Sequence, residues 1–410
     1  MERSNFFGLS RPVWLLGWVS LATDAASEAI YPLLPFFLTQ ILGAGVVSLG
    51  VIEGAAEAAN SALKVLAGRL SDRAASKRWL VFTGYALSSA VRPLMAVAQT
   101  WTHVLTVRLI DRTGKGIRGA PRDAMLASLA TPATRGKVFG FHRAMDHLGA
   151  VVGPVVASVF LFYRPGEYRT LFALAIIPGT VAVALILLIK EGKREDTPRA
   201  PADGSQVVSG ANHITSEIPI GTEPIPGRLK AFLVVLTLFT LGNSTDAFLL
   251  LQLTDVAGSV RIVPLMWAAL HVVKATMSVV GGNWSDRIGR RAVIAIGWTV
   301  YAFVYAGFAM STTLPALLTW FLVYGLYFGL TEGVEKALVA DLAPVSRRGY
   351  AFGIYNAVQG VGGLAASVIF GLMWNAIGSV AAFGTGAALA ITSAALLFVA
   401  VPSTDRAAVR

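Results

Sequence analysis

Long apolar runs, separated by short polar stretches, make up most of this chain. A helix needs roughly 20 apolar residues to cross the hydrocarbon core of a bilayer. The runs therefore predict transmembrane helices. We place twelve of them, at residues 12–38, 45–68, 79–98, 101–129, 137–163, 168–190, 229–255, 260–284, 292–310, 314–341, 349–375 and 379–401.

The longest polar stretch separates the sixth run from the seventh. Residues 191–228 combine charged residues with proline, glycine and serine, a composition typical of a flexible linker. We therefore divide the chain into an N-terminal six-helix bundle at 1–190, a linker at 191–228 and a C-terminal six-helix bundle at 229–410. The polar segment before the first run leads into it without a small-residue cleavage site, so we interpret that run as a spanning helix and not as a removed signal peptide.

Basic residues concentrate in alternate loops, and this pattern sets the expected orientation. One set of loops contains Arg69, Arg73, Lys77, Arg78, Arg135, Lys137, Arg287, Arg290, Arg291, Arg347 and Arg348, whereas the opposite set contains little beyond Arg164, Arg169 and Arg261. Loops rich in lysine and arginine stay in the cytoplasm. We expect both termini and the linker on the cytoplasmic side of a bacterial inner (plasma) membrane.

Composition excludes several other classes of protein. Only 14% of the residues are charged, whereas soluble domains carry about 25%. The net charge of +11 does not indicate nucleic-acid binding, because the basic residues lie in short loops between apolar runs. The chain has no cysteine, which excludes disulfides and cysteine-ligated metals.

An internal repeat relates the two halves of the chain. Ala124-Met-Leu-Ala-Ser-Leu-Ala recurs as Ala337-Leu-Val-Ala-Asp-Leu-Ala, and Arg135-Gly-Lys-Val-Phe-Gly recurs as Arg348-Gly-Tyr-Ala-Phe-Gly at the same spacing. A six-helix repeat is typical of transporters whose halves are related by an axis along the membrane normal. The fold class that we predict is an all-α integral membrane protein with twelve transmembrane helices in two pseudo-symmetric six-helix bundles.

Two matched loops carry a resemblance to a known family. Gly68-Arg-Leu-Ser-Asp-Arg and Gly282-Asn-Trp-Ser-Asp-Arg-Ile-Gly-Arg-Arg resemble the loop motif of the major facilitator superfamily, although the first copy has Ala75 where the second has a glycine. Glycine permits close helix contact, an aspartate is stabilised at a neighbouring helix N-terminus, and arginines reach the headgroups. In that family the cluster stabilises the outward-facing state. The resemblance implies a gating role for Gly68, Asp72, Arg73, Gly282, Asp286, Arg287 and Arg290.

Three further stretches resemble the twelve-helix proton-antiporter branch of this family, which includes drug exporters. The first is Tyr31-Pro-Leu-Leu-Pro at the end of the first span. The second is Arg112-Thr-Gly-Lys-Gly-Ile-Arg-Gly-Ala in the fourth span, with two departures from the usual pattern, at Lys115 and Arg118. The third, in the fifth span, has Ala157-Ser158 in place of the motif's final glycine pair; it comprises Gly140, Gly149, Gly153 and Pro154.

Ionisable residues within the spans are the candidate functional groups, because each costs several kcal/mol unless it faces a cavity or a partner. Five charged residues of the fourth span fall within an arc of about 80°; they are Arg108, Asp111, Lys115, Arg118 and Arg122. Arg118, Arg122 and Asp123 either line the cavity or extend to the headgroups. In the family, helices one, four, seven and ten line the cavity. Any single candidate can instead be a buried structural ion pair; the set is Asp24, Glu28, Arg108, Asp111, Arg112, Lys115, Arg143, Asp146, Asp246, Glu332 and Glu335.

These features together predict a secondary active transporter, monomeric and driven by a proton gradient, that exports a small organic compound by alternating access. Arg112 is the natural cation for Asp24 or Glu28. An uptake permease for an organic or inorganic anion is the first alternative, and a non-transporting membrane sensor is the second. No catalytic motif is present, and we predict no cofactor. We also predict no metal site, because His142 and His147 project about 140° apart on a helix.

Overall fold

The computed structural model describes residues 8–44, 46–74, 76–189, 223–244, 246–257 and 263–401. Regular structure in these ranges is helical throughout, and helices occupy each of the twelve predicted spans. This arrangement confirms the predicted all-α membrane fold. It follows from the apolar runs because, in lipid, every backbone polar group must be hydrogen-bonded within the protein, and a helix achieves this within one segment.

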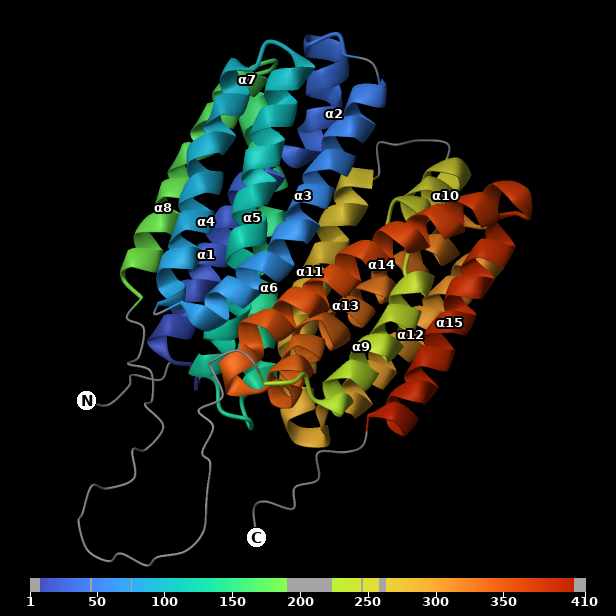
Figure 1. Ribbon diagram of the computed structural model, residues 1–410. Coiled ribbons are helices and arrows are strands. Elements are labelled where there is room, and N and C mark those ends of the chain that lie inside the picture. The colour runs from blue at the N-terminus through green and yellow to red at the C-terminus, as the bar shows by residue number, and fades with distance from the viewer. Residues whose placement is uncertain are drawn as a thin grey trace, which may run out of the picture.

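Two bundles of helices make up the molecule (Figure 1). The first contains α1 (Arg11–Glu28), η1 (Tyr31–Leu33), α2 (Leu34–Phe36), η2 (Phe37–Ile41), α3 (Val46–Arg73), α4 (Lys77–Val91), η3 (Arg92–Val97), α5 (Trp101–Leu129), α6 (Arg135–Tyr163), α7 (Tyr168–Leu174) and α8 (Ile176–Leu187). The second contains α9 (Gly227–Gly242), α10 (Ala247–Ala257), α11 (Val263–Ile288), α12 (Arg290–Met310), α13 (Leu314–Leu342), η4 (Val345–Arg347), α14 (Arg348–Ala376) and α15 (Ser379–Ala400).

The α-helix is interrupted within the first, third, sixth and seventh predicted spans, and the breaks in the first and the seventh bear on the candidate site. In the first span α1 ends at Glu28, and the chain continues through short helical turns that contain Pro32 and Pro35, because proline has no N–H to donate and its ring collides with the preceding turn. In the seventh span α9 ends at Gly242 and α10 begins at Ala247. Both interruptions lie beside ionisable residues of the predicted cavity.

Seven helical stretches in the described part of the chain are long and apolar enough, by length and composition, to cross a membrane. Helix α5 is not among them, because charged residues fill its middle, between Arg108 and Asp123. A helix that carries such residues through a bilayer must turn them toward protein or a water-filled space. The charged part of α5 therefore has to face the interior of the molecule.

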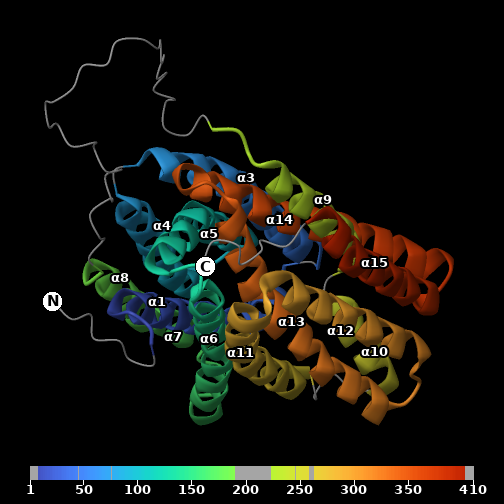
Figure 2. The same ribbon diagram turned by 90° about the horizontal axis from the view of Figure 1, so that it is seen from below.

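Glycines mark the contacts between the two bundles. Helix α3 runs beside α14 and α6 runs beside α11 (Figure 2). A side chain at Gly68 of α3 would collide with the backbone of Gly349 in α14, and one at Gly140 of α6 would collide with the backbone of α11 near Gly282. These contacts lie toward the end of the molecule that holds the loops after α3 and α11, which we call the motif end. The helices diverge toward the opposite end, where α2 and α10 lie (Figure 1).

The glycines of the antiporter-like motif in α6 pack against two different neighbouring helices. Gly140 faces α11 of the other bundle, whereas Gly149 and Gly153 face the backbone of α1 between Leu21 and Ala29. Pro154 lies inside α6. The close packing expected of this motif is therefore present, and it brings α1 directly against α6 beside Asp24, whose Cβ lies next to Gly149.

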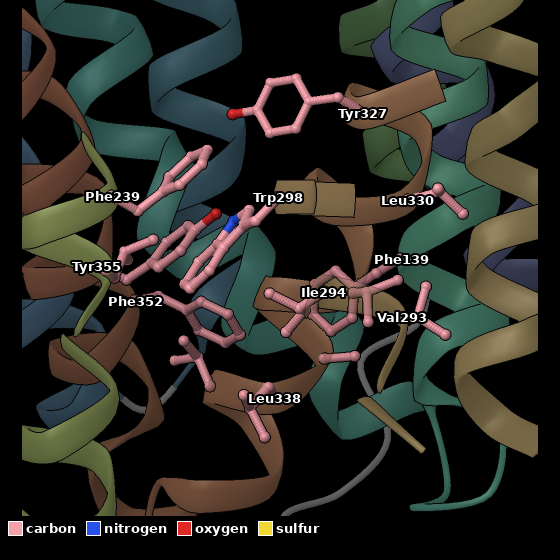
Figure 3. Packing of buried hydrophobic residues seen from close by; sticks show 14 of the residues in the cluster. Phe139, Phe239, Val293, Ile294, Trp298, Tyr327, Leu330, Leu338, Phe352 and Tyr355 are labelled. Carbon is pink, nitrogen blue, oxygen red and sulfur yellow. The ribbon is translucent and has the colours of Figure 1, made fainter. Parts of the chain in front are cut away.

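Aromatic packing fills the core of the second bundle (Figure 3). The Trp298 ring stacks on Phe239 with 4.5 Å between ring centroids, and both side chains are fully buried. At the bundle interface Phe139 of α6 lies against Phe352 of α14, with 5.8 Å between ring centroids. This apolar layer closes the space between the bundles toward the motif end.

The predicted domain boundaries fall on residues that the structure describes only in part. Helix α8 ends at Leu187 and α9 begins at Gly227, while residues 190–222 lie outside the described ranges. Residues 1–7 and 402–410 also lie outside them. The linker at 191–228 and the cytoplasmic placement of both termini stay predictions.

Candidate functional site

Arg108 and Asp111 belong to a buried cluster inside the first bundle. Asp111 accepts a hydrogen bond from Arg92 Nε at 2.9 Å, and Arg108 lies 3.9 Å from the same carboxylate. Arg92 also donates to the Thr23 carbonyl of α1 at 3.0 Å. These side chains are almost completely buried and border a small pocket under Tyr31. Asp111 is thus held by protein cations, which leaves it poorly placed to bind a ligand.

Four other predicted cavity residues form no such pairs. Asp24 and Glu28 project from α1, and Arg112 and Lys115 project from α5. Among the described residues no ion pair within 4.0 Å involves any of the four, and Arg112 Nε has no hydrogen-bond partner. The expected pairing of Arg112 with Asp24 or Glu28 is therefore wrong for this conformation, although Arg112 lies within electrostatic reach of Glu28.

The surface of α5 around Lys115 is open. Lys115 is exposed although it lies at the middle of a membrane-spanning helix. One turn later, a side-chain carbon added at Gly119 would meet no atom within 4 Å. Lys115 lies within electrostatic reach of both Asp24 and Glu28 without touching either. We call Asp24, Glu28, Arg112 and Lys115 the open quartet.

A charged network joins the two bundles beside the open quartet. Asp146 accepts hydrogen bonds from Arg143 at 2.9 Å and from the Ser20 hydroxyl of α1. Across the interface, Glu332 of α13 accepts from His147 Nε2 at 3.1 Å and lies 3.9 Å from Arg143 Nε. The sequence placed Arg143, Asp146 and Glu332 in the cavity, and the structure brings all three together. Because the network crosses the interface, movement of one bundle must strain or break it.

Asp246 and Glu335 lie in the second bundle in two different environments. Asp246 accepts a hydrogen bond from Tyr324 at 2.8 Å and lies 3.5 Å from Lys274 Nζ. Glu335 is buried and accepts only from neutral groups, at 3.0 Å each, which are Trp298 Nε1, Tyr355 OH and Gln359 Nε2. Asp246 is therefore charge-paired, whereas Glu335 is held by dipoles.

Asp123 and Arg118 do not extend to the headgroups. Asp123 pairs with Lys336 of α13 at 2.6 Å, and both side chains are almost completely buried. Arg118 donates to Ser88 at 2.7 Å and lies over the Tyr85 ring. Of the two alternatives left open by the sequence, extension to the headgroups is therefore wrong for both. Arg122 likewise turns inward, to Asp123 at 3.1 Å.

At the motif end the two loop motifs make equivalent contacts. Asp72 accepts from the backbone N–H groups of Gly349 and Tyr350, at 2.7 and 2.8 Å. Asp286 accepts from those of Gly136 and Lys137, at 3.0 and 2.8 Å. Each carboxylate thus caps the N-terminus of a helix in the other bundle, where the backbone donors and the helix dipole favour an anion.

The arginines of the motifs divide into two groups. Arg73 and Arg287 are exposed, as a position in the headgroup zone requires. Arg290 is buried and pairs with Asp286 and, at 3.1 Å, with Asp341 of α13. Gly289 has a φ of 95°, a backbone conformation that glycine permits in the turn between α11 and α12. The corresponding residue of the first copy, Ala75, lies outside the described residues.

The candidate set from the sequence omitted Arg92, His147, Lys274 and Lys336, each of which pairs with an acidic residue of the interior. The sequence offered one signal for these residues, which is an ionisable side chain within an apolar run. The sequence does not say which acid each one meets, because the partners lie on helices remote along the chain.

Comparison with known proteins gives a consistent result along the chain. The family model described as Major Facilitator Superfamily matches residues 14–270 and 231–410. An uncharacterized MFS-type transporter of Methanocaldococcus jannaschii is 33% identical over 395 residues, which is 95% of this chain and 94% of the relative. The multidrug resistance protein MdtH of Cronobacter sakazakii is 22% identical over 337 residues, or 82% of this chain and 79% of the relative.

Solved structures give the same architecture. The human organic anion transporter MFSD10 (TETRAN) superposes with a TM-score of 0.73 at 19% identity and covers 94% of this chain and 99% of its own. The transporter FucP in its outward conformation superposes with a TM-score of 0.71 at 15% identity, covering 95% of this chain and 98% of its own. At 19% and 15% identity, the likeness to these two structures shows the fold alone.

Proposed function

This chain belongs to the Major Facilitator Superfamily, and from that premise we propose that it exports a small organic compound in exchange for protons. Membership in the family makes the protein a membrane transporter of small molecules and not an enzyme. The coupling ion and the direction are the proposed part. The low-identity relationship to a multidrug resistance protein supports export.

One observation carries the proton coupling. Asp24 and Glu28 lie one turn apart on α1, and neither forms an ion pair within 4.0 Å with a described residue. A carboxylate in a low-dielectric cavity binds a proton more readily when no cation is close, and releases it when a cation approaches. Lys115 and Arg112, on the facing helix, are the cations that can approach.

Alternating access supplies the movement that this exchange requires. The bundles are joined at the motif end by the capped helices and the Asp123–Lys336 pair. Rocking of one bundle against the other around the central site exposes the open quartet to one side of the membrane at a time. Protons then enter from the open side and leave when the cavity opens to the other side.

Flux in liposomes tests this proposal. Purified protein is first screened by thermal shift against metabolites and drugs, and the stabilising compounds are then assayed for transport under an imposed pH gradient. We expect Asp24→Asn or Glu28→Gln to abolish the pH-driven component, while binding persists in at least one of them with a flattened pH dependence. Arg112→Ala should also lose transport, because nothing resets the carboxylate.

The contradicting outcomes are specific. If both carboxamide variants transport as the wild type does and stay pH-sensitive, the proton site lies elsewhere, and Asp246, Glu332 and Glu335 are the next candidates. If the wild-type protein moves its compound without moving protons, the exchange mechanism is wrong.

Uptake of an anion is the second candidate function. The cationic side chains of Arg112 and Lys115 face the cavity, and the structural relative MFSD10 is described as an organic anion transporter. An anion importer raises the accumulation of its substrate in cells, whereas an exporter lowers it. Accumulation of a labelled compound in cells with and without the protein separates the two candidates.

A further inference from the structure

The open quartet contains two like-charged pairs that face each other. Asp24 and Glu28 are four residues apart on α1, and Arg112 and Lys115 are three residues apart on α5. Residues at these spacings are neighbours on one helix face, and like charges there repel. Arg112 and Lys115 act on each other in this way, and Asp24 and Glu28 do so as well. Each pair therefore gains from a group of opposite charge placed between its members.

Four other acids of the interior receive such a group from the protein itself. Asp111 has Arg92, Asp123 has Lys336, Asp146 has Arg143 and Asp246 has Lys274. The four residues of the open quartet, by contrast, have no ion-pair partner within 4.0 Å among the described residues. A space bordered by two anions on one side and two cations on the other is complementary to a molecule that carries one charge of each sign.

From this arrangement we infer that the substrate is a small zwitterion, with an ammonium group that binds between Asp24 and Glu28 and a carboxylate that binds between Arg112 and Lys115. The inference rests on the cavity assigned under the proposed function and names its substrate class. It also gives the exchange a simple physical basis, because the ammonium group and the proton compete for the same carboxylates. A purely anionic or purely cationic substrate would leave one like-charged pair without a counter-charge.

The cavity has room for the rest of such a molecule. Beyond Lys115, the surface of α5 at Gly119 is open, with no atom within 4 Å of an added side-chain carbon. A side chain attached between the two charged groups can extend into this space. Its chemistry is set by residues that line the remainder of the cavity, while the charges fix the orientation of the molecule between α1 and α5.

Matched ligand triplets test the inference by binding alone. The panel contains amino acids that differ in their side chain and that carry the amino group at either the α or the terminal carbon. Each free amino acid is compared with its amide, which is only cationic, and with its N-acetyl derivative, which is only anionic. Binding is followed by thermal stabilisation of the detergent-purified protein. We expect at least one free amino acid to bind about tenfold or more tightly than both derivatives.

Variants assign each charge of the ligand to one side of the cavity. Lys115→Met should weaken binding of the free amino acid by about tenfold and leave binding of the amide unchanged. Asp24→Asn should weaken binding of the free amino acid by a similar factor and leave binding of the N-acetyl derivative unchanged. Lys230→Met, an exposed position on α9, is the matched control, and the melting temperature without ligand reports folding of each variant.

Three results overturn the inference: an N-acetyl derivative that binds as tightly as the free amino acid, an amide that does so, or no binding by any member of any triplet. The binding assay needs neither a membrane nor a gradient, so its outcome is independent of the flux assay. Binding of a zwitterion without proton exchange contradicts only the proposed function. Proton-driven flux of a compound with a single charge contradicts only the substrate class.

Discussion

At the scale of single residues, the interior charges divide into those that hold the protein together and those that remain open to a ligand. Arg92 is the clearest member of the first group. Its guanidinium joins three helical segments, because η3 carries it, α5 supplies Asp111 and α1 supplies the Thr23 carbonyl. Lys115 represents the second group, with an exposed ammonium at the middle of a spanning helix.

We predict that Arg92→Met strongly destabilises the protein. Removing one partner of a buried ion pair leaves the other charge uncompensated, which costs about 3–5 kcal/mol. The double variant Arg92→Met/Asp111→Asn should recover part of this loss, because it removes the orphaned charge. Thermal unfolding in detergent measures both effects, with Arg164→Met, at an exposed loop position, as the control. Equal melting temperatures for Arg92→Met and Arg164→Met would contradict a structural role.

At the scale of helices, the two loop motifs are related by the repeat but are not equally reinforced. Beside Asp286, the carboxylate of Asp341 pairs with both Arg135 and Arg290. The repeat that aligns Ala124 with Ala337 places Ser128 where the second copy has Asp341. The α3–α14 contact therefore lacks the acid that reinforces the α6–α11 contact, and it depends more on its capping aspartate.

This asymmetry predicts that Asp72→Asn has a larger effect than Asp286→Asn. An asparagine has a single carboxamide oxygen where the carboxylate accepts from two N–H groups, and hydrogen bonds to a charged group are worth about 1.5–3 kcal/mol. Turnover in liposomes should fall in both variants at unchanged expression, and roughly tenfold further in Asp72→Asn. Wild-type turnover in both would show that the motifs serve only membrane topology. A larger loss in Asp286→Asn would contradict the asymmetry.

At the scale of the whole molecule, the bundles meet through residues that are themselves related by the repeat. The alignment of Ala124 with Ala337 also aligns Asp123 with Lys336, and these two side chains pair with each other. A contact between equivalent positions of two halves lies at the pseudo-symmetry axis between them. The buried pair therefore lies at the centre of the interface on the motif side and must separate when this side opens.

We predict that Lys336→Met shifts the conformational equilibrium toward closure of the end opposite the motifs. The absence of cysteine from the chain allows spin labels at introduced cysteines, with Thr102→Cys on the first bundle and Thr312→Cys on the second, both exposed at that end. The distance between the labels should shorten in Lys336→Met. The swapped variant Asp123→Lys/Lys336→Asp keeps a pair and should resemble the wild type. An unchanged distance distribution in Lys336→Met would show that the pair does not hold this conformation.

The sequence alone determined the transmembrane architecture, because the length of an apolar run and the hydrogen-bonding requirement of the backbone in lipid act locally. The repeat predicted two related bundles, and the charged residues within the spans identified the interior. The contacts of the paired aspartates at the helix N-termini followed from motif chemistry.

Only the tertiary structure decided which charges pair. Asp123 and Lys336 are more than half the chain apart, and Arg92 was absent from the candidate set although it holds Asp111. An ion pair depends on distances of a few ångströms between helices. For Asp123 and Lys336 the packing of Gly68, Gly136, Gly140 and Gly282 at the bundle interface sets that distance. The open quartet likewise became visible only once α1 and α5 were placed within the first bundle: its members are defined by how these two helices lie relative to each other, which no local pattern encodes.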